Sequence, residues 1–119
     1  MAYRLNITEH AEELLDDIVY HLLFRLKNEQ AARHLLDNID CIYERLEENP
    51  FQFPASRDKY LAKRDYREAI VPQMDYVIVF DVREGTVNVV GIFHQLENYQ
   101  RKLCGQRGRA PLHFALRQR

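Results

Sequence analysis

The sequence contains few glycines, few cysteines and no long apolar run, and each shortage excludes a class of protein. With four glycines among 119 residues, the chain has no glycine-rich loop of the kind that cradles phosphates. Two cysteines do not make a disulfide framework for a fold of this size, and we expect Cys41 to be a small, buried or half-buried residue. No apolar run reaches the roughly 18 residues of a membrane span, and the first residues lack the apolar region of a signal peptide. We therefore expect a cytoplasmic protein that does not enter a membrane.

Metal-binding patterns are also lacking. His10, His21 and His34 fall on predicted helices, without the i, i+4 histidine pair or the nearby cysteine of a zinc site. We expect no metal and no other cofactor.

The charges are distributed unevenly along the chain. Residues 1–50 hold 5 Lys or Arg against 11 Asp or Glu, a balance of −6, whereas residues 51–119 hold 12 against 7, a balance of +5. This split fits an acidic helical surface followed by an ordinary basic surface. It also fits a one-sided basic patch for an anionic partner, either nucleic acid or an acidic protein segment. The sequence alone leaves both interpretations open.

The first half of the chain predicts a strand and two helices. Residues 3–7 alternate between apolar and polar, which is typical of a short strand. Thr8 is a good helix N-cap, and apolar residues then keep helical spacing as far as Leu26. A second apolar stripe covers Ala32 to Leu46 and ends before Pro50. Residues 49–54 form a proline-rich link, and we expect its two phenylalanines to pack beneath it. Since each helix must bury its stripe, we expect an antiparallel hairpin.

The second half predicts three strands. They cover residues 66–71, 75–82 and 87–94, and residues 83–86 form a turn with a glycine available for positive φ. The last strand is apolar on both faces, which predicts a central position in the sheet. Consecutive strands joined by short turns pair antiparallel, and the helical hairpin is the available cover for their sheet. The fold class is therefore α+β with the order β-α-α-β-β-β, a helical hairpin packed on a small, mainly antiparallel sheet.

The chain is short enough to form one domain, and 46% of its residues are apolar, enough for a core. We assign the domain to residues 1–104. Residues 105–119 are polar, basic and without sustained pattern, so we expect a loosely ordered tail there.

Cationic and aromatic residues suited to a phosphodiester stand near both ends of the predicted sheet. Arg67 and Arg64 are candidates to hold a phosphate, with Lys63 steering the backbone and Tyr66 beside them. His94 is the candidate proton carrier, because histidine titrates near neutral pH. Tyr99 could stack on a base or support His94. Together these side chains would serve attack of a ribose 2′-OH on the adjacent phosphate, provided that they meet at one edge of the sheet.

Three of these residues also have a purely structural interpretation. Arg67 could form a surface ion pair with Glu68 or Asp75, which would contribute little. His94 could be a partly buried histidine at a strand end, and Tyr99 could belong to the core with its hydroxyl at the rim.

The order of elements, with five local patterns, resembles the RelE/ParE superfamily of toxins from type II toxin–antitoxin (plasmid stabilisation) systems. The matching patterns are Tyr3 to Ala11, Ala31 to Leu46 with Asn49-Pro50-Phe51, Tyr66-Arg67, Tyr76 to Phe80, and Ile92-Phe93-His94 with Asn98-Tyr99. The resemblance implies a growth-inhibiting toxin that a cognate antitoxin holds silent. An acidic segment of that antitoxin would face the basic cluster of residues 63–67.

The resemblance implies two modes of toxicity. RelE-like members cleave mRNA on the ribosome without a metal, whereas ParE-like members poison DNA gyrase and lack the nuclease residues. Many superfamily members carry an arginine shortly before the closing histidine and basic residues after it, where this chain has Gly91, Leu96 and Glu97. Our first expectation is a ribosome-dependent mRNA endonuclease that uses Arg67 and His94. The alternatives are a ParE-like gyrase inhibitor and a noncatalytic member that retains only antitoxin binding.

Overall fold

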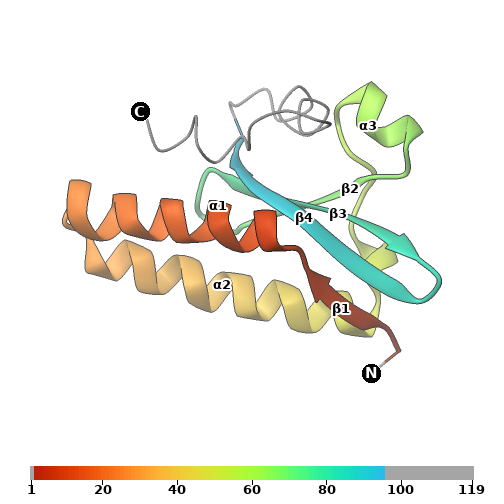
Figure 1. The fold of residues 1–119 in the computed structure, drawn as a ribbon, viewed down its shortest axis with the longest axis horizontal. Coiled ribbons are helices and arrows are strands. Elements are labelled where there is room, and N and C mark those ends of the chain that lie inside the picture. Colours follow the sequence, from red (N-terminus) through yellow and green to blue (C-terminus); the bar gives the residue numbers. More distant parts are fainter. Residues whose placement is uncertain (1, 96–119) are drawn as a thin grey trace.

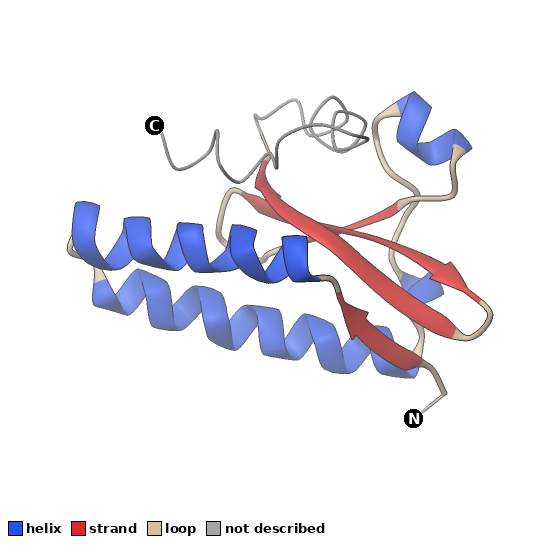
Figure 2. Ribbon diagram, viewed as in Figure 1, coloured by secondary structure: helices blue, strands red, loops and turns tan. Residues whose placement is uncertain are grey.

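The computed structural model describes residues 2–95, and it confirms the α+β class and the order of elements (Figures 1 and 2). The helical hairpin lies along one side of a twisted sheet in Figure 1, and a short helix stands beside the opposite edge of that sheet. The elements are β1 (Arg4–Ile7), α1 (Glu9–Tyr20), a π-helical turn η1 (His21–Arg25), α2 (Glu29–Glu48), a 3-10 turn η2 (Pro50–Gln52), α3 (Lys59–Lys63), β2 (Arg67–Ile70), β3 (Tyr76–Arg83) and β4 (Thr86–His94).

The two long helices begin at polar caps. The Thr8 hydroxyl accepts a hydrogen bond from the Ala11 N–H at 3.1 Å, as the sequence predicted. The Asn28 side chain accepts one from the Ala31 N–H at 3.0 Å at the start of α2. Each cap satisfies an N–H that the helix itself leaves unpaired. The predicted apolar stripes are buried, at Leu14 and Ile18 of α1 and at Leu35, Ile39, Ile42 and Leu46 of α2.

The sheet has the strand order β1-β4-β3-β2. β1 pairs with β4 in parallel, while β3 pairs antiparallel with both β4 and β2. β4 is central, as its apolar character predicted. The register shifts by one residue where Val79 and Phe80 of β3 face Gly91 and Val89 of β4, so Val90 is an extra residue there. Such a bulge bends the strand and increases its twist.

Three local features differ from the sequence-based expectations. Cys41 is exposed rather than buried. We expected both phenylalanines of the proline-rich link to pack beneath it, but only Phe53 is buried, while Phe51 is exposed. The short helix α3 was not predicted. It begins at Asp58, whose carboxylate accepts hydrogen bonds from the N–H groups of Tyr60 and Leu61.

None of the helices within residues 2–95 has both the length and the apolar character needed to cross a membrane.

Candidate functional site

Arg67, the first residue of β2, is held by the proline-rich link. Its Nη1 donates a hydrogen bond to the Phe53 carbonyl oxygen at 2.6 Å. The guanidinium carbon lies 5.0 Å from the centroid of the Phe51 ring, within the range of a cation–π contact. Arg67 is half-buried. Its planar side chain therefore fastens the link to the sheet edge.

His94 is the last residue of β4, and its ring contacts Tyr76 edge to face, with 5.8 Å between the ring centroids. The strand register separates this ring from Arg67. Arg67 pairs with Phe80 of β3, whereas His94 pairs with Tyr76, four positions away on the same strand. Because β2 and β4 are both antiparallel to β3, they run in the same direction. The start of β2 therefore lies beside the middle of β3, whereas the end of β4 lies beside the first residue of β3.

The sheet geometry gives the size of this separation. Four residues span about 13 Å along a strand, and β2 and β4 stand about 10 Å apart across β3, so the two backbone positions are about 16 Å apart. The expectation that Arg67 and His94 share one anion-sized hollow is therefore wrong for this structure.

The structure does not bring the other candidate residues together with Arg67 and His94 into one phosphodiester site. Lys63 ends α3, and Arg64 follows it with the guanidinium carbon 4.9 Å from the Tyr60 ring centroid. Tyr66 is half-buried and packs against the core, and its carbonyl accepts a hydrogen bond from the Ser56 N–H at 2.9 Å. Tyr99, like Leu96, Glu97 and the tail, lies outside the described residues.

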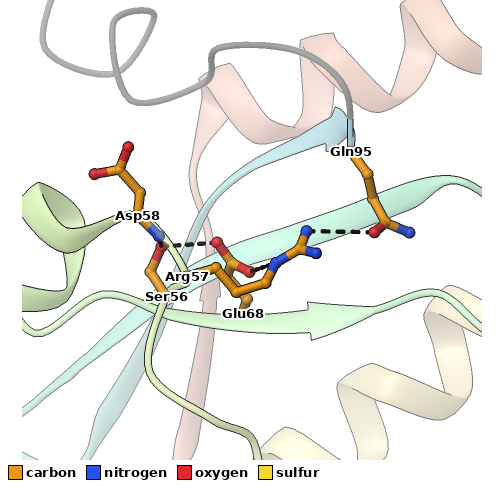
Figure 3. Close-up of polar contacts among 5 residues, drawn as sticks. All are labelled: Ser56, Arg57, Asp58, Glu68 and Gln95. Atoms are coloured by element: carbon orange, nitrogen blue, oxygen red, sulfur yellow. Dashed lines mark hydrogen bonds and ion pairs between the residues drawn. The ribbon is translucent and has the colours of Figure 1, made fainter.

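Glu68 of β2 is a buried carboxylate that forms hydrogen bonds with the segment before α3 (Figure 3). From the sequence it was a possible surface partner of Arg67. Glu68 is 2% exposed. Its Oε2 accepts a hydrogen bond from the Ser56 hydroxyl at 2.7 Å, and its Oε1 lies 3.2 Å from Arg57 Nε. Arg57 also donates from Nη2 to Gln95 Oε1 at 3.3 Å. The Ser56 oxygen in turn accepts from the Asp58 N–H at 3.2 Å.

This network joins the segment before α3 to β2 and to the residue that follows β4. It also argues against the alternative of a surface ion pair between Arg67 and Glu68, because neighbouring strand residues point to opposite faces. Arg67 shares its face with Phe80, and Glu68 shares the other with Val79. An acid directly before the apolar run of residues 69–71 was the sequence signal for a buried, paired carboxylate.

A second polar chain crosses three strands. Asp81 accepts hydrogen bonds from Arg83 Nε and from Asn88 Nδ2, each at 3.0 Å. Asn88 accepts another from Asn6 Nδ2 at 2.9 Å, which reaches β1. The hydrogen bond to Asp81 raises the pKa of Arg83 above its ordinary value. These hydrogen bonds connect β1, β4 and β3. None of them places a proton-transferring side chain beside Arg67.

Among residues 2–95, no three His, Cys, Asp or Glu side chains lie close enough together to hold an ion.

Comparison with known proteins now identifies the family. A family model described as the ParE toxin of the type II toxin-antitoxin system, parDE, matches residues 5–99. The chain belongs to this family. A solved chain of a structure described as the chromosomal ParDE TA system from P. aeruginosa is similar to it, with a TM-score of 0.63 and 18% sequence identity. The similarity covers 78% of this chain and 96% of that chain, and at this identity it supports the ParE fold.

A search of curated proteins found no match to the chain. The ParE family match confirms the resemblance to the RelE/ParE superfamily and the assignment as a toxin of a type II toxin–antitoxin system. Membership of a ParDE family also implies a cognate antitoxin. Neither comparison supports RNA binding or an endoribonuclease activity.

Proposed function

We propose that this ParE family toxin slows growth by binding and inhibiting DNA gyrase, and that a cognate antitoxin prevents this. The gyrase-directed mode is the one that the superfamily resemblance attaches to ParE-like members. It replaces our first expectation, ribosome-dependent mRNA cleavage.

The distance between Arg67 and His94 is the observation that favours gyrase inhibition over mRNA cleavage. Cleavage by 2′-OH attack needs a base, an acid and charge stabilisation around a single phosphate. Groups about 16 Å apart in backbone position, on strands of the same direction, do not surround one phosphate. The Arg67 guanidinium is moreover bonded to the Phe53 carbonyl and stacked on Phe51. A toxin that acts by binding a protein needs no such constellation.

The antitoxin is proposed to cover the basic segment around α3. Residues 57–67 contain five Lys or Arg against two Asp, a balance of +3, although the whole chain carries −1. Arg57, Lys63 and Arg64 are exposed within this segment. Acidic side chains of a partner would be attracted to this surface and oriented on it.

Induced expression in a bacterium tests the proposal, with growth rate, chromosomal DNA breaks and new mRNA 5′ ends measured in the same cultures. We expect slowed growth and DNA breaks without new 5′ ends, and rescue by co-expressed antitoxin. Purified gyrase incubated with the toxin should accumulate cleaved DNA.

His94→Ala and Arg67→Ala separate the two modes of action. Both variants should remain toxic, with circular dichroism as the control for folding. New mRNA 5′ ends that disappear in His94→Ala would replace gyrase inhibition with RNA cleavage. Antitoxin binding without any effect on growth would instead indicate a noncatalytic member that no longer acts on a target.

A further inference from the structure

The tip of the helical hairpin, residues 20–27, exposes large apolar side chains. Tyr20 is 60% exposed, Phe24 is 62% exposed and Leu26 is 58% exposed. The rings of Tyr20 and Phe24 contact each other with 4.8 Å between their centroids. Single exposed apolar residues are ordinary on a protein surface, but a group with paired aromatic rings is typical of a contact site.

A π-helical turn, η1, carries Phe24 and is flanked by Tyr20 and Leu26. The Leu26 N–H donates to the His21 carbonyl oxygen at 3.0 Å, five residues back, and the Asn28 N–H donates to the Leu22 carbonyl oxygen at 2.8 Å. Leu22 is buried and anchors the turn to the core, while Phe24 points to solvent. π-turns are rare and are frequently found at functional sites.

The tip is cationic, although the helices that carry it are acidic. Arg25 and Lys27 are exposed, and no Asp or Glu occurs from residue 18 to residue 28. The preceding stretch, residues 9–17, holds five acids and no Lys or Arg. A partner that accepts the aromatic pair would therefore gain from carboxylates around its apolar contact site.

We propose that the hairpin tip is the surface that docks on gyrase, with Tyr20, Phe24 and Leu26 entering an apolar site whose rim is acidic. This inference rests on the proposed gyrase inhibition and names the part of the chain that carries it out. A second copy of this chain fits the tip less well, because a two-fold contact would set Arg25 and Lys27 against their own copies. In Figure 1 the tip and α3 lie at opposite ends of the fold. An antitoxin bound to the basic segment would therefore leave the tip accessible to gyrase.

The test measures binding of the full-length toxin, purified free of its antitoxin, to purified gyrase by surface plasmon resonance. The variant Tyr20→Ala/Phe24→Ala removes both exposed rings. We expect its affinity for gyrase to fall by about tenfold or more, as for other aromatic anchors of an interface. Its affinity for the antitoxin should stay within about twofold of wild type, because the substituted side chains are not hot spots of that interface.

Ile70→Ala is the matched control, since it also shortens a large exposed side chain, 49% exposed, on β2 rather than on the hairpin. It should bind gyrase as wild type does. Lys27→Asn is the second variant, because it removes a charge where φ is +50°, a conformation that asparagine tolerates well. It should weaken gyrase binding mainly at low salt, through a slower association rate.

The outcomes separate the two proposals. If wild-type toxin binds gyrase and Tyr20→Ala/Phe24→Ala binds equally well, the docking surface is wrong while gyrase inhibition stands. If the double variant loses the antitoxin and keeps gyrase, the tip is an antitoxin surface. If the wild type self-associates through the tip, the occupant is a second copy. If the wild-type toxin does not bind gyrase at all, both proposals fail.

Discussion

The ring of Phe93 occupies the space that a side chain on Gly91 would need. An ideal Cβ at position 91 would lie 2.5 Å from Phe93 Cε2 and 3.3 Å from a methyl carbon of Leu14. Both neighbours are buried in the core, so neither can move aside without disturbing it. The arginine that many superfamily members carry near this position therefore has no room at residue 91.

Gly91→Ala should destabilise the fold by overpacking. We expect a loss of about 1–3 kcal/mol in the free energy of unfolding, measured by urea denaturation. Gly85→Ala is the comparison, because a Cβ there meets nothing within 4 Å but φ is +78°. It should cost about 1–2 kcal/mol through backbone strain alone. A Gly91→Ala variant as stable as wild type would contradict the close approach of Phe93.

Arg67→Ala should destabilise the protein because it removes the bond to the Phe53 carbonyl and the contact with the Phe51 ring. We expect a loss of about 1–3 kcal/mol in the free energy of unfolding. Arg64→Ala is the control, since Arg64 is exposed and its guanidinium stacks on Tyr60. It should cost less than about 1 kcal/mol. Equal effects of the two substitutions in thermal or urea unfolding would argue against a structural role for Arg67.

The fold was predictable because its signals are local. Thr8 caps α1 as expected, and the apolar stripes of α1 and α2 required an antiparallel hairpin. The features that were missed have weak or conflicting local signals. α3 is five residues long and depends on the cap at Asp58 rather than on an apolar stripe. The π-turn lies within the stretch that kept helical spacing as far as Leu26, and that spacing does not distinguish it from an α-helix.

The candidate site was less predictable because it depends on strand direction and register. Arg67 and His94 each stand at the end of a strand, which suggested one shared edge. Their strands are parallel to each other because both flank β3 in antiparallel fashion. The separation of the two residues along the sheet therefore followed from the topology that the sequence had already predicted. The buried position of Glu68, by contrast, depends on Ser56 and Arg57, which approach from outside the sheet.

Glu68→Gln should destabilise the protein although it preserves the size of the side chain. It removes the charge that faces Arg57 and replaces an oxygen acceptor with an amide donor inside the network. We expect a loss of about 1–3 kcal/mol in the free energy of unfolding. Glu44→Gln, at an exposed position of α2, should stay within about 0.5 kcal/mol of wild type.

A double-mutant cycle with Arg57→Ala measures the coupling in that network. The ion pair is half in water, because the Arg57 side chain is 57% exposed. We therefore expect a coupling free energy of about 1 kcal/mol, rather than the larger values of fully buried pairs. Additive effects of Glu68→Gln and Arg57→Ala would show that the two side chains do not stabilise each other.

Tyr43 should make the protein sensitive to alkaline pH. Burial, together with the negative charges of Asp40 and Glu12, raises the pKa of Tyr43 from 10.0 to about 12. Because the folded-state pKa lies above the unfolded value, the stabilisation is fully present below pH 10 and is lost as pH rises toward 12. The free energy of unfolding should fall by at most about 1.4 kcal/mol per pH unit from this group in that window. Urea denaturation at several pH values should give a shallower decline for Tyr43→Phe than for wild type, and tyrosinate absorbance should show one late-titrating phenol that the variant lacks. Identical alkaline declines in the two proteins would mean that the Tyr43 hydroxyl is not protected from ionisation.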